Sequence, residues 1–119
     1  MNKTNYNYDR EADVLYISFT HSQQVFTVEL SDYLILRLDL GKENGGIPHA
    51  VGITILFPAE LLKQGHNPLA LQLDRLHRFS AEVKSAVLEV LSKPPVSEIL
   101  AARLEFTSAA PRLPELLAA

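Results

Sequence analysis

Three carboxylates lie within five residues near the start of the chain, at Asp9, Glu11 and Asp13. Closely spaced acidic side chains are the ligands that Ca²⁺ and Mg²⁺ prefer, so one interpretation of this segment is a cation-binding loop. An EF-hand loop also needs glycine at its sixth position and glutamate at its twelfth, where this chain has Val14 and Thr20. We therefore interpret the segment as a solvated turn between two strands and predict no metal site in it.

The other residues with the chemistry of catalysis or metal binding are histidines. An imidazole acts as a general base or a zinc ligand only when suitable partners stand beside it. No two histidines have the His-x-x-x-His spacing, and none neighbours a serine with an evident orienting acid. We interpret them as surface or loop residues, at His21, His49, His66 and His77. The sequence thus predicts a non-enzyme with no catalytic, cofactor-binding or metal-binding residue and no cofactor.

Three segments have a binding function as an alternative interpretation. Gly41 to Gly46 lacks the Gly-Lys-Ser/Thr motif and no helix follows it, so we expect a hairpin connection and not a phosphate loop. Aromatic residues of the first strands could stack on single-stranded nucleic acid, but no basic residues alternate with them, so we expect packing roles for Tyr6, Tyr8, Tyr16 and Phe19. The segment Leu69 to Phe79 is either a partner-binding segment, through Arg75, His77 and Arg78, or a connector that packs its leucines on the core.

Composition excludes several classes of protein. The 119 residues suit one domain, and 47% hydrophobic residues are typical of a globular chain. The net charge is −3 and the basic residues are scattered except at Arg75-Leu76-His77-Arg78, so we expect no direct nucleic-acid binding. The absence of cysteine excludes disulfides, thiolate metal sites and cysteine nucleophiles. No secretory signal stands at the N-terminus and no stretch approaches the ~20 apolar residues of a membrane span, so we expect a cytoplasmic protein without membrane contact.

The first half of the chain has the residue pattern of β-strands. In Tyr33 to Leu40 every second residue is leucine, and a period of two places all four leucines on one face. Alternation and β-branched or aromatic content predict further strands at Tyr6–Tyr8, Val14–Phe19, Val25–Leu30 and Ala50–Phe57. Short connections between them favour an antiparallel β-meander of four to five strands.

The second half of the chain predicts helices. Pro58 suits a first helical turn, and Gly65 suits the stop that follows. Ser80 is a good N-cap for an amphipathic helix that ends near Lys93, before two prolines. We expect Ser97 to cap another helix, which runs to Phe106, whereas the segment Leu69–Leu76 fits either a strand or a helical turn.

These elements predict a single α+β domain over residues 1–119, with an antiparallel sheet followed by a C-terminal helical layer. We expect a sheet module with the first helix over residues 1–64 and a helical extension over residues 65–106. Residues 107–119 contain two further prolines and are expected to dock loosely or to fray.

The strand motifs resemble those of a bacterial family of small proteins, domain-of-unknown-function family 2283. Its opening pattern is similar to Tyr8-Asp9-Arg10-Glu11-Ala12-Asp13-Val14-Leu15-Tyr16-Ile17, and its later strands are similar to Thr27–Leu30, Leu34–Asp39 and Val51-Gly52-Ile53-Thr54-Ile55-Leu56. The resemblance covers about the first half of the chain; the segment Gly41–Ala50 and the helical tail from Leu69 exceed the usual member. It implies a compact antiparallel sheet followed by a helix, relatives encoded beside small toxin-like proteins, and no catalytic residues.

Strands Val14–Phe19 and Tyr33–Leu40 have apolar residues on both faces. Both faces cannot stay in water, because burial of each large apolar side chain is worth about 1.5–3 kcal/mol. We expect the helices Ser80–Lys93 and Ser97–Phe106 to cover one face, and a second copy to cover the other face or an open strand edge. The sequence thus predicts a homodimeric interaction or regulatory module. The alternatives are an antitoxin-like partner of a small toxin, which would bind through the helical tail, and a small ligand-binding protein or enzyme with a site at a dimer seam.

Overall fold

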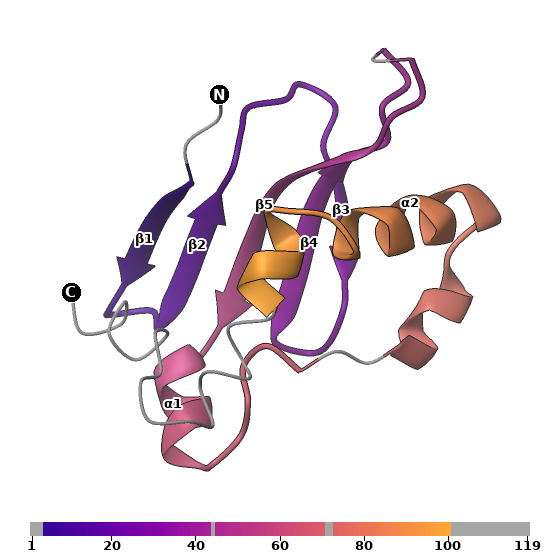
Figure 1. Ribbon diagram of the computed structural model, residues 1–119. Coiled ribbons are helices and arrows are strands. Elements are labelled where there is room, and N and C mark those ends of the chain that lie inside the picture. Colours follow the sequence, from indigo (N-terminus) through magenta and orange to yellow (C-terminus); the bar gives the residue numbers. More distant parts are fainter. Residues whose placement is uncertain (1–3, 44, 71–72, 101–119) are drawn as a thin grey trace.

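The computed structural model describes residues 4–43, 45–70 and 73–100 (Figure 1). Five strands precede the helices, which confirms the α+β class: β1 (Asn5–Asp9), β2 (Val14–Ser18), β3 (Phe26–Glu29), β4 (Leu34–Asp39) and β5 (His49–Leu56). The helices are α1 (Pro58–Lys63), the 3₁₀ helix η1 (Leu73–Arg78) and α2 (Ala81–Leu91), and a last helical segment begins at Val96 and is described as far as Leu100. The division at residue 64 stays a prediction, and the tail 107–119 lies outside the described residues.

The strands form one antiparallel sheet with the order β1-β2-β5-β4-β3. Strands that follow one another in the sequence pair antiparallel in β1–β2, β3–β4 and β4–β5, as a meander requires. The last strand, β5, enters between β2 and β4, so the connection from β2 to β3 passes across one end of the sheet. The central position of β5 explains why Ala50, Val51, Gly52 and Ile53 are all buried in succession.

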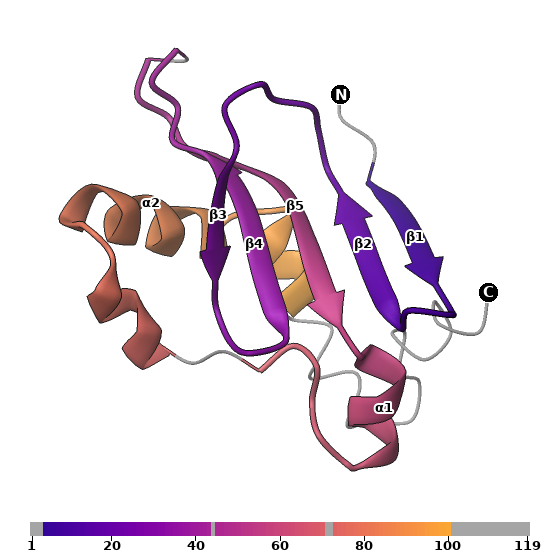
Figure 2. The same ribbon diagram turned by 180° about the vertical axis from the view of Figure 1, so that it is seen from behind.

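Helices cover one face of the sheet. In Figure 1, α2 and the segment 96–100 lie in front of the strands, and Figure 2 shows the opposite face without a helix over it. The core contains inward-facing residues of the strands, of α2 and of the helical segment that begins at Val96: Leu15, Ile17, Val28, Leu34, Leu36, Leu38, Ile53, Ile55, Val83, Val87, Val90 and Val96. The expectation that the later helices cover one face is confirmed for α2 and for residues 96–100, whereas residues 101–106 lie outside the described part.

Local signals located the helix ends well. The helix α1 begins at Pro58, and Gly65 follows it with a φ of 78°, a conformation that glycine adopts without strain. The Ser80 hydroxyl accepts a hydrogen bond from the Val83 amide (3.3 Å) at the start of α2. The segment Leu69–Leu76, left open between strand and helix, enters a 3₁₀ helix at Leu73, and residues 71–72 lie outside the described part.

The prediction that Ser97 caps the last helix is wrong. Helical residues begin at Val96, and the Ser97 amide already donates a hydrogen bond to the Lys93 carbonyl oxygen (2.9 Å). Val96 is fully buried in the core, and the helix that contains it begins two residues earlier than an N-cap at Ser97 would require. No helix within the described ranges has the length and apolar content needed to cross a membrane.

Candidate functional site

The turn carboxylates separate in the structure, and only Asp13 is held by long-range contacts. Its Oδ1 accepts hydrogen bonds from the Tyr8 hydroxyl (2.7 Å) and the Ala59 amide (3.2 Å), and its Oδ2 accepts one from the Glu60 amide (3.2 Å). Both amides belong to the first turn of α1, whose own N-cap residue, Phe57, makes no side-chain cap. Asp13 therefore caps a helix that lies 46 residues further along the chain.

The predicted solvated turn is present, but Asp13 departs from it. Asp9 and Glu11 are exposed, and Asp9 Oδ1 accepts a hydrogen bond from the Ala12 amide (3.1 Å) within the turn. Asp13 is half-buried, with a φ of 54° that turns its carboxylate toward α1. No group of three or more potential metal ligands occurs within the described residues.

The contact with Asp13 also changes the acidity of Tyr8. The hydrogen bond to the carboxylate, together with desolvation and the nearby negative charge, raises the pKa of Tyr8 to about 12. A phenolate would lose this hydrogen bond and face the carboxylate as a like charge. Because the folded pKa lies above the ordinary value of 10.0, the contact contributes its full stability below about pH 10 and loses it as the pH rises toward about 12.

We expect Asp13→Asn to lower the pKa of Tyr8 toward its ordinary value, because the negative charge is removed, and to cost less than about 1 kcal/mol of stability, because an asparagine amide oxygen can still cap the helix. An NMR titration of ¹³C-labelled tyrosine rings, followed by thermal unfolding near neutral pH, measures both effects. Glu11→Gln is the matched control, since Glu11 is an exposed acid of the same turn. An unchanged Tyr8 titration in Asp13→Asn would contradict the assignment.

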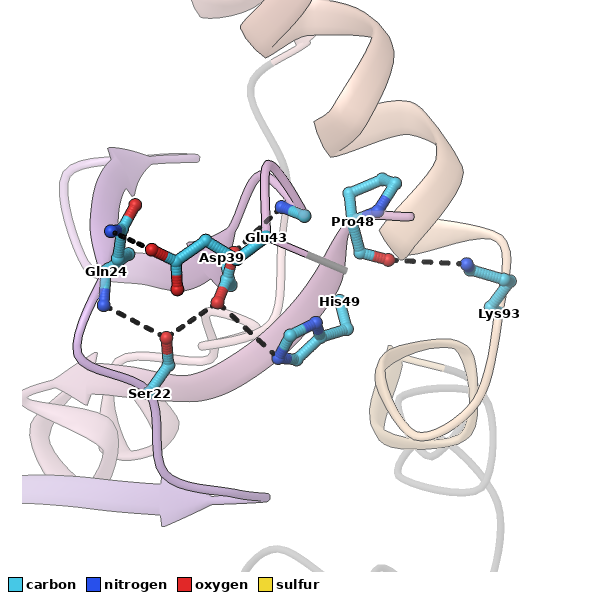
Figure 3. A network of polar contacts seen from close by, with 8 residues as sticks. Ser22, Gln24, Asp39, Glu43, Pro48, His49 and Lys93 are labelled. Carbon is cyan, nitrogen blue, oxygen red and sulfur yellow. Dashed lines mark hydrogen bonds and ion pairs between the residues drawn. The ribbon is translucent and has the colours of Figure 1, made fainter. Parts of the chain in front are cut away.

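A second polar cluster lies at the end of the sheet that the β2–β3 connection crosses, and Figure 3 shows it from close by. The Ser22 hydroxyl donates to Asp39 Oδ2 (2.6 Å), and the Gly41 amide donates to Asp39 Oδ1 (2.8 Å). The imidazole Nε2 of His49 lies 3.9 Å from Asp39 Oδ2. The backbone amide of Gln24 donates to Ser22 Oγ (3.0 Å), a hydrogen bond within the connection itself.

Serine, aspartate and histidine are the residue types of an acyl-transfer triad, but their order here differs. In a triad the imidazole lies between hydroxyl and carboxylate, so that it can take the serine proton. Here Asp39 lies between Ser22 and His49 (Figure 3). The hydrogen bonds from Ser22 and Gly41 lower the pKa of Asp39, which makes its carboxylate a weak base. The cluster therefore has a structural role: it holds the β2–β3 connection against β4 and β5.

Sequence reasoning missed this cluster because its members lie on three separate segments. Ser22 and Asp39 are 17 residues apart, and His49 begins β5. Of the four histidines, His21, His66 and His77 are exposed as expected, whereas His49 is a half-buried strand residue and not part of a loop. A local signal existed only for Gly41, which stands two residues after the last residue of β4 and adopts a φ of 80°.

The remaining candidate segments have structural roles. Gly41–Gly46 joins β4 to β5, closed by a hydrogen bond from the Gly46 amide to the Gly41 carbonyl (2.7 Å), as the hairpin prediction required. The aromatic residues form no common platform, because Tyr6 and Tyr8 are in register with core-facing Ile17 and Leu15, whereas Tyr16 lies on the opposite face.

The connector interpretation of Leu69–Phe79 agrees with the burial of Leu69 and Leu76. Arg75 also forms ion pairs with Glu29 (3.4 Å) and Asp32.

One sizeable cavity, of about 650 Å³, lies between the start of β5 and the segment after α2. Its walls include Pro48, His49, Pro95 and Val96, and its volume is that of a small-molecule pocket. Its cation, Lys93, already contacts Glu89 Oε2 (3.0 Å) and the Pro48 carbonyl oxygen (3.4 Å; Figure 3). An anionic ligand would therefore have to displace both contacts.

The sheet face opposite α2, here called the open face, is a broader candidate (Figure 2). Strand register arranges its residues in three rows across the sheet. The first row is Thr27, Arg37, Gly52, Ser18 and Asn5; the second is Glu29, Ile35, Thr54, Tyr16 and Asn7; the third is Leu56, Val14 and Asp9. All are exposed or half-buried except Gly52, which is buried.

Arg37 lies over Gly52 on the open face. A Cβ atom at position 52 would collide with Arg37 Nη2 and would lie 2.6 Å from the Ile17 carbonyl oxygen, so only glycine fits beneath the guanidinium. Arg37 Nε is buried without a hydrogen-bond partner among the described residues. A guanidinium is a set of five donors, and leaving a buried donor unpaired costs about 1–3 kcal/mol.

Comparison with known protein families gives a match over the sheet segment of the chain. Residues 5–57 match the model of a family described as a protein of unknown function (DUF2283). The match spans all five strands and ends immediately before α1. No significant match was found among curated proteins or among solved structures.

Proposed function

Residues 5–57, the sheet segment, match the model of the DUF2283 family, and we propose that the protein is a non-enzymatic interaction module that self-associates through its open face. One observation carries the proposal: within residues 4–43, 45–70 and 73–100, helices cover only one face of the sheet (Figure 2), and the other face presents apolar side chains. These are Val14, Tyr16, Ile35 and Leu56. Family membership itself supplies no activity.

The apolar residues of the open face are neighbours. Val14 pairs with Leu56 across β2 and β5, and Thr54 lies between Tyr16 and Ile35 in the adjacent row. Tyr16 is 40% exposed, which leaves a large ring in water. A sheet face that stays solvated is normally polar, so a contiguous apolar patch of this kind supports a contact surface. A second copy carries the same patch, and a two-fold dimer would bury both at once.

The polar clusters support a role without catalysis. Asp13 and Tyr8 secure a helix start, and Ser22, Asp39 and His49 hold a loop, so each side chain has a structural task. The antitoxin-like alternative depends on the helical tail, and residues 101–119 lie outside the described part. An enzyme site at a dimer seam would need a catalytic pair on the open face, and its residues include no histidine.

Light scattering coupled to size-exclusion chromatography tests the proposal. We expect wild-type protein at twice the chain mass of 13.2 kDa, and Tyr16→Glu at the mass of one chain, because a carboxylate would then be buried at the centre of the patch. Leu88→Glu is the matched control, since Leu88 is 47% exposed on α2 and lies away from the open face. Circular dichroism should be alike for all three. A wild-type protein that stays monomeric over a series of increasing loading concentrations, or a Tyr16→Glu variant that stays dimeric, would refute the proposal.

A further inference from the structure

We propose that the self-association is a two-fold contact in which Arg37 of one copy pairs with Asp9 of the other, and reciprocally. The inference rests on the proposed function and adds the residues that set the orientation of the two copies. A cation and a carboxylate stand at opposite ends of one diagonal of the open face, and the apolar residues lie between them.

Strand register gives the positions. Arg37 is in the first row on β4, and Asp9 is in the third row on β1, with β5 and β2 between them. At ~4.8 Å between strands and ~3.4 Å per residue, the two positions are roughly 20 Å apart. The midpoint of this diagonal falls between Tyr16 and Thr54, which pair directly across β2 and β5.

A two-fold axis through that midpoint, lying between the two faces and perpendicular to the diagonal, exchanges the two charged corners. It places Arg37 of each copy over Asp9 of the other, because an isologous interface makes every contact twice. The same rotation sets Ile35 of one copy against Val14 and Leu56 of the other and brings the two Tyr16 rings together at the axis. One operation thus buries the apolar residues and pairs the charges.

The charges of the open face leave few other pairings. Glu29 already lies 3.4 Å from Arg75, and the carboxylate of Asp39 already accepts from Ser22 and Gly41. Asp9 is exposed, and its Oδ1 accepts only from the Ala12 amide of its own turn among the hydrogen bonds identified for it, so further acceptor capacity points outward. Arg37 is half-buried, with its Nε enclosed by its own chain, so a carboxylate of the other copy would meet the exposed part of the guanidinium, whose planar fork it matches.

The size of the face predicts a reversible dimer. Five strands at ~4.8 Å and five residues at ~3.4 Å give a footprint of roughly 24 by 17 Å, or about 800 Å² over both copies, which is the size of a weak, transient contact. Association must therefore be measured over a concentration series, for which sedimentation equilibrium is suitable.

Charge exchange between copies tests the pairing. Arg37→Glu alone and Asp9→Arg alone each place like charges together twice, and we expect each to weaken the dimer at least tenfold. In an equimolar mixture of the two variants, both contacts become Glu–Arg and Asp–Arg pairs, so the heterodimer should regain wild-type affinity. A mixture of Arg37→Glu with Glu29→Arg is the control and should not regain it.

Cross-linking gives an independent measurement if a charge variant folds poorly. The chain has no cysteine, so Arg37→Cys mixed with Asp9→Cys should form an intermolecular disulfide under a mild oxidant, and neither variant alone should do so. Wild-type protein that is monomeric would refute both proposals. A dimer that Tyr16→Glu breaks, but whose mixtures neither regain affinity nor cross-link, would refute the Arg37–Asp9 pairing and leave the proposed function intact.

Discussion

Leu36→Asp should leave the chain unfolded at room temperature. Leu36 is completely buried on β4, in register with Val28 and Ile53 on its two neighbouring strands. Removal of a buried leucine side chain costs about 2–5 kcal/mol, and an unpaired carboxylate in the same place adds several more. The free energy of unfolding of a small domain is about 5–15 kcal/mol, so the substitution removes most or all of this stability. Circular dichroism and thermal melting measure the result.

Leu88→Asp makes the same chemical change at an exposed position of α2 and serves as the control. We expect its melting temperature to stay close to that of wild type, since exposed substitutions change stability by about 0.5 kcal/mol or less. If Leu36→Asp melted together with Leu88→Asp, β4 could not have its leucines in the core, and the sheet assignment would fail.

Gly52→Ala should cost about 1–3 kcal/mol, the usual range for an extra carbon in a closely packed place. The new Cβ would lie 2.6 Å from the Ile17 carbonyl oxygen, which is backbone of the paired strand, and would overlap Arg37 Nη2. The Arg37 side chain can move aside, but β2 cannot move without weakening its ladder with β5. We expect a fall in melting temperature of about 5–20 °C and weaker self-association.

Two further variants separate the causes. Thr54→Ala removes a side chain from the same face of β5 without crowding β2, and its melting temperature should lie near that of wild type. Gly52→Ala combined with Arg37→Ala should recover only part of the lost stability, because the clash with Ile17 remains. Complete recovery would show that the glycine is required only by the arginine.

Local patterns in the sequence predicted the elements correctly. The alternation from Tyr33 to Leu40 placed Leu34, Leu36 and Leu38 on the buried face, as the structure has them. Ser80 and Pro58 located two helix starts, because capping and φ restriction act within a single turn. The one failed cap, Ser97, lies where a buried side chain, Val96, outweighed the local preference.

Local sequence patterns could not predict the order of the strands in the sheet. Short connections predicted that neighbours in sequence pair, and they do so in β1–β2 and in β3–β4–β5. The position of β5 against β2 depends on which apolar faces complete the core together, and that is a property of the whole sheet. The meeting of Ser22, Asp39 and His49 follows from this order, and so does the three-row pattern of the open face.

By itself, the sequence determined the secondary structure, the division of apolar residues between two sheet faces, and the likeness of the sheet segment to a known family. Only the tertiary structure decided that Asp13 caps α1, that Gly52 makes room for Arg37, and that the helices among the described residues leave one face open. The physical reason is the range of the interactions. Backbone periodicity and capping act over a few residues, whereas hydrogen bonds and packing join whatever the fold brings within a few ångströms.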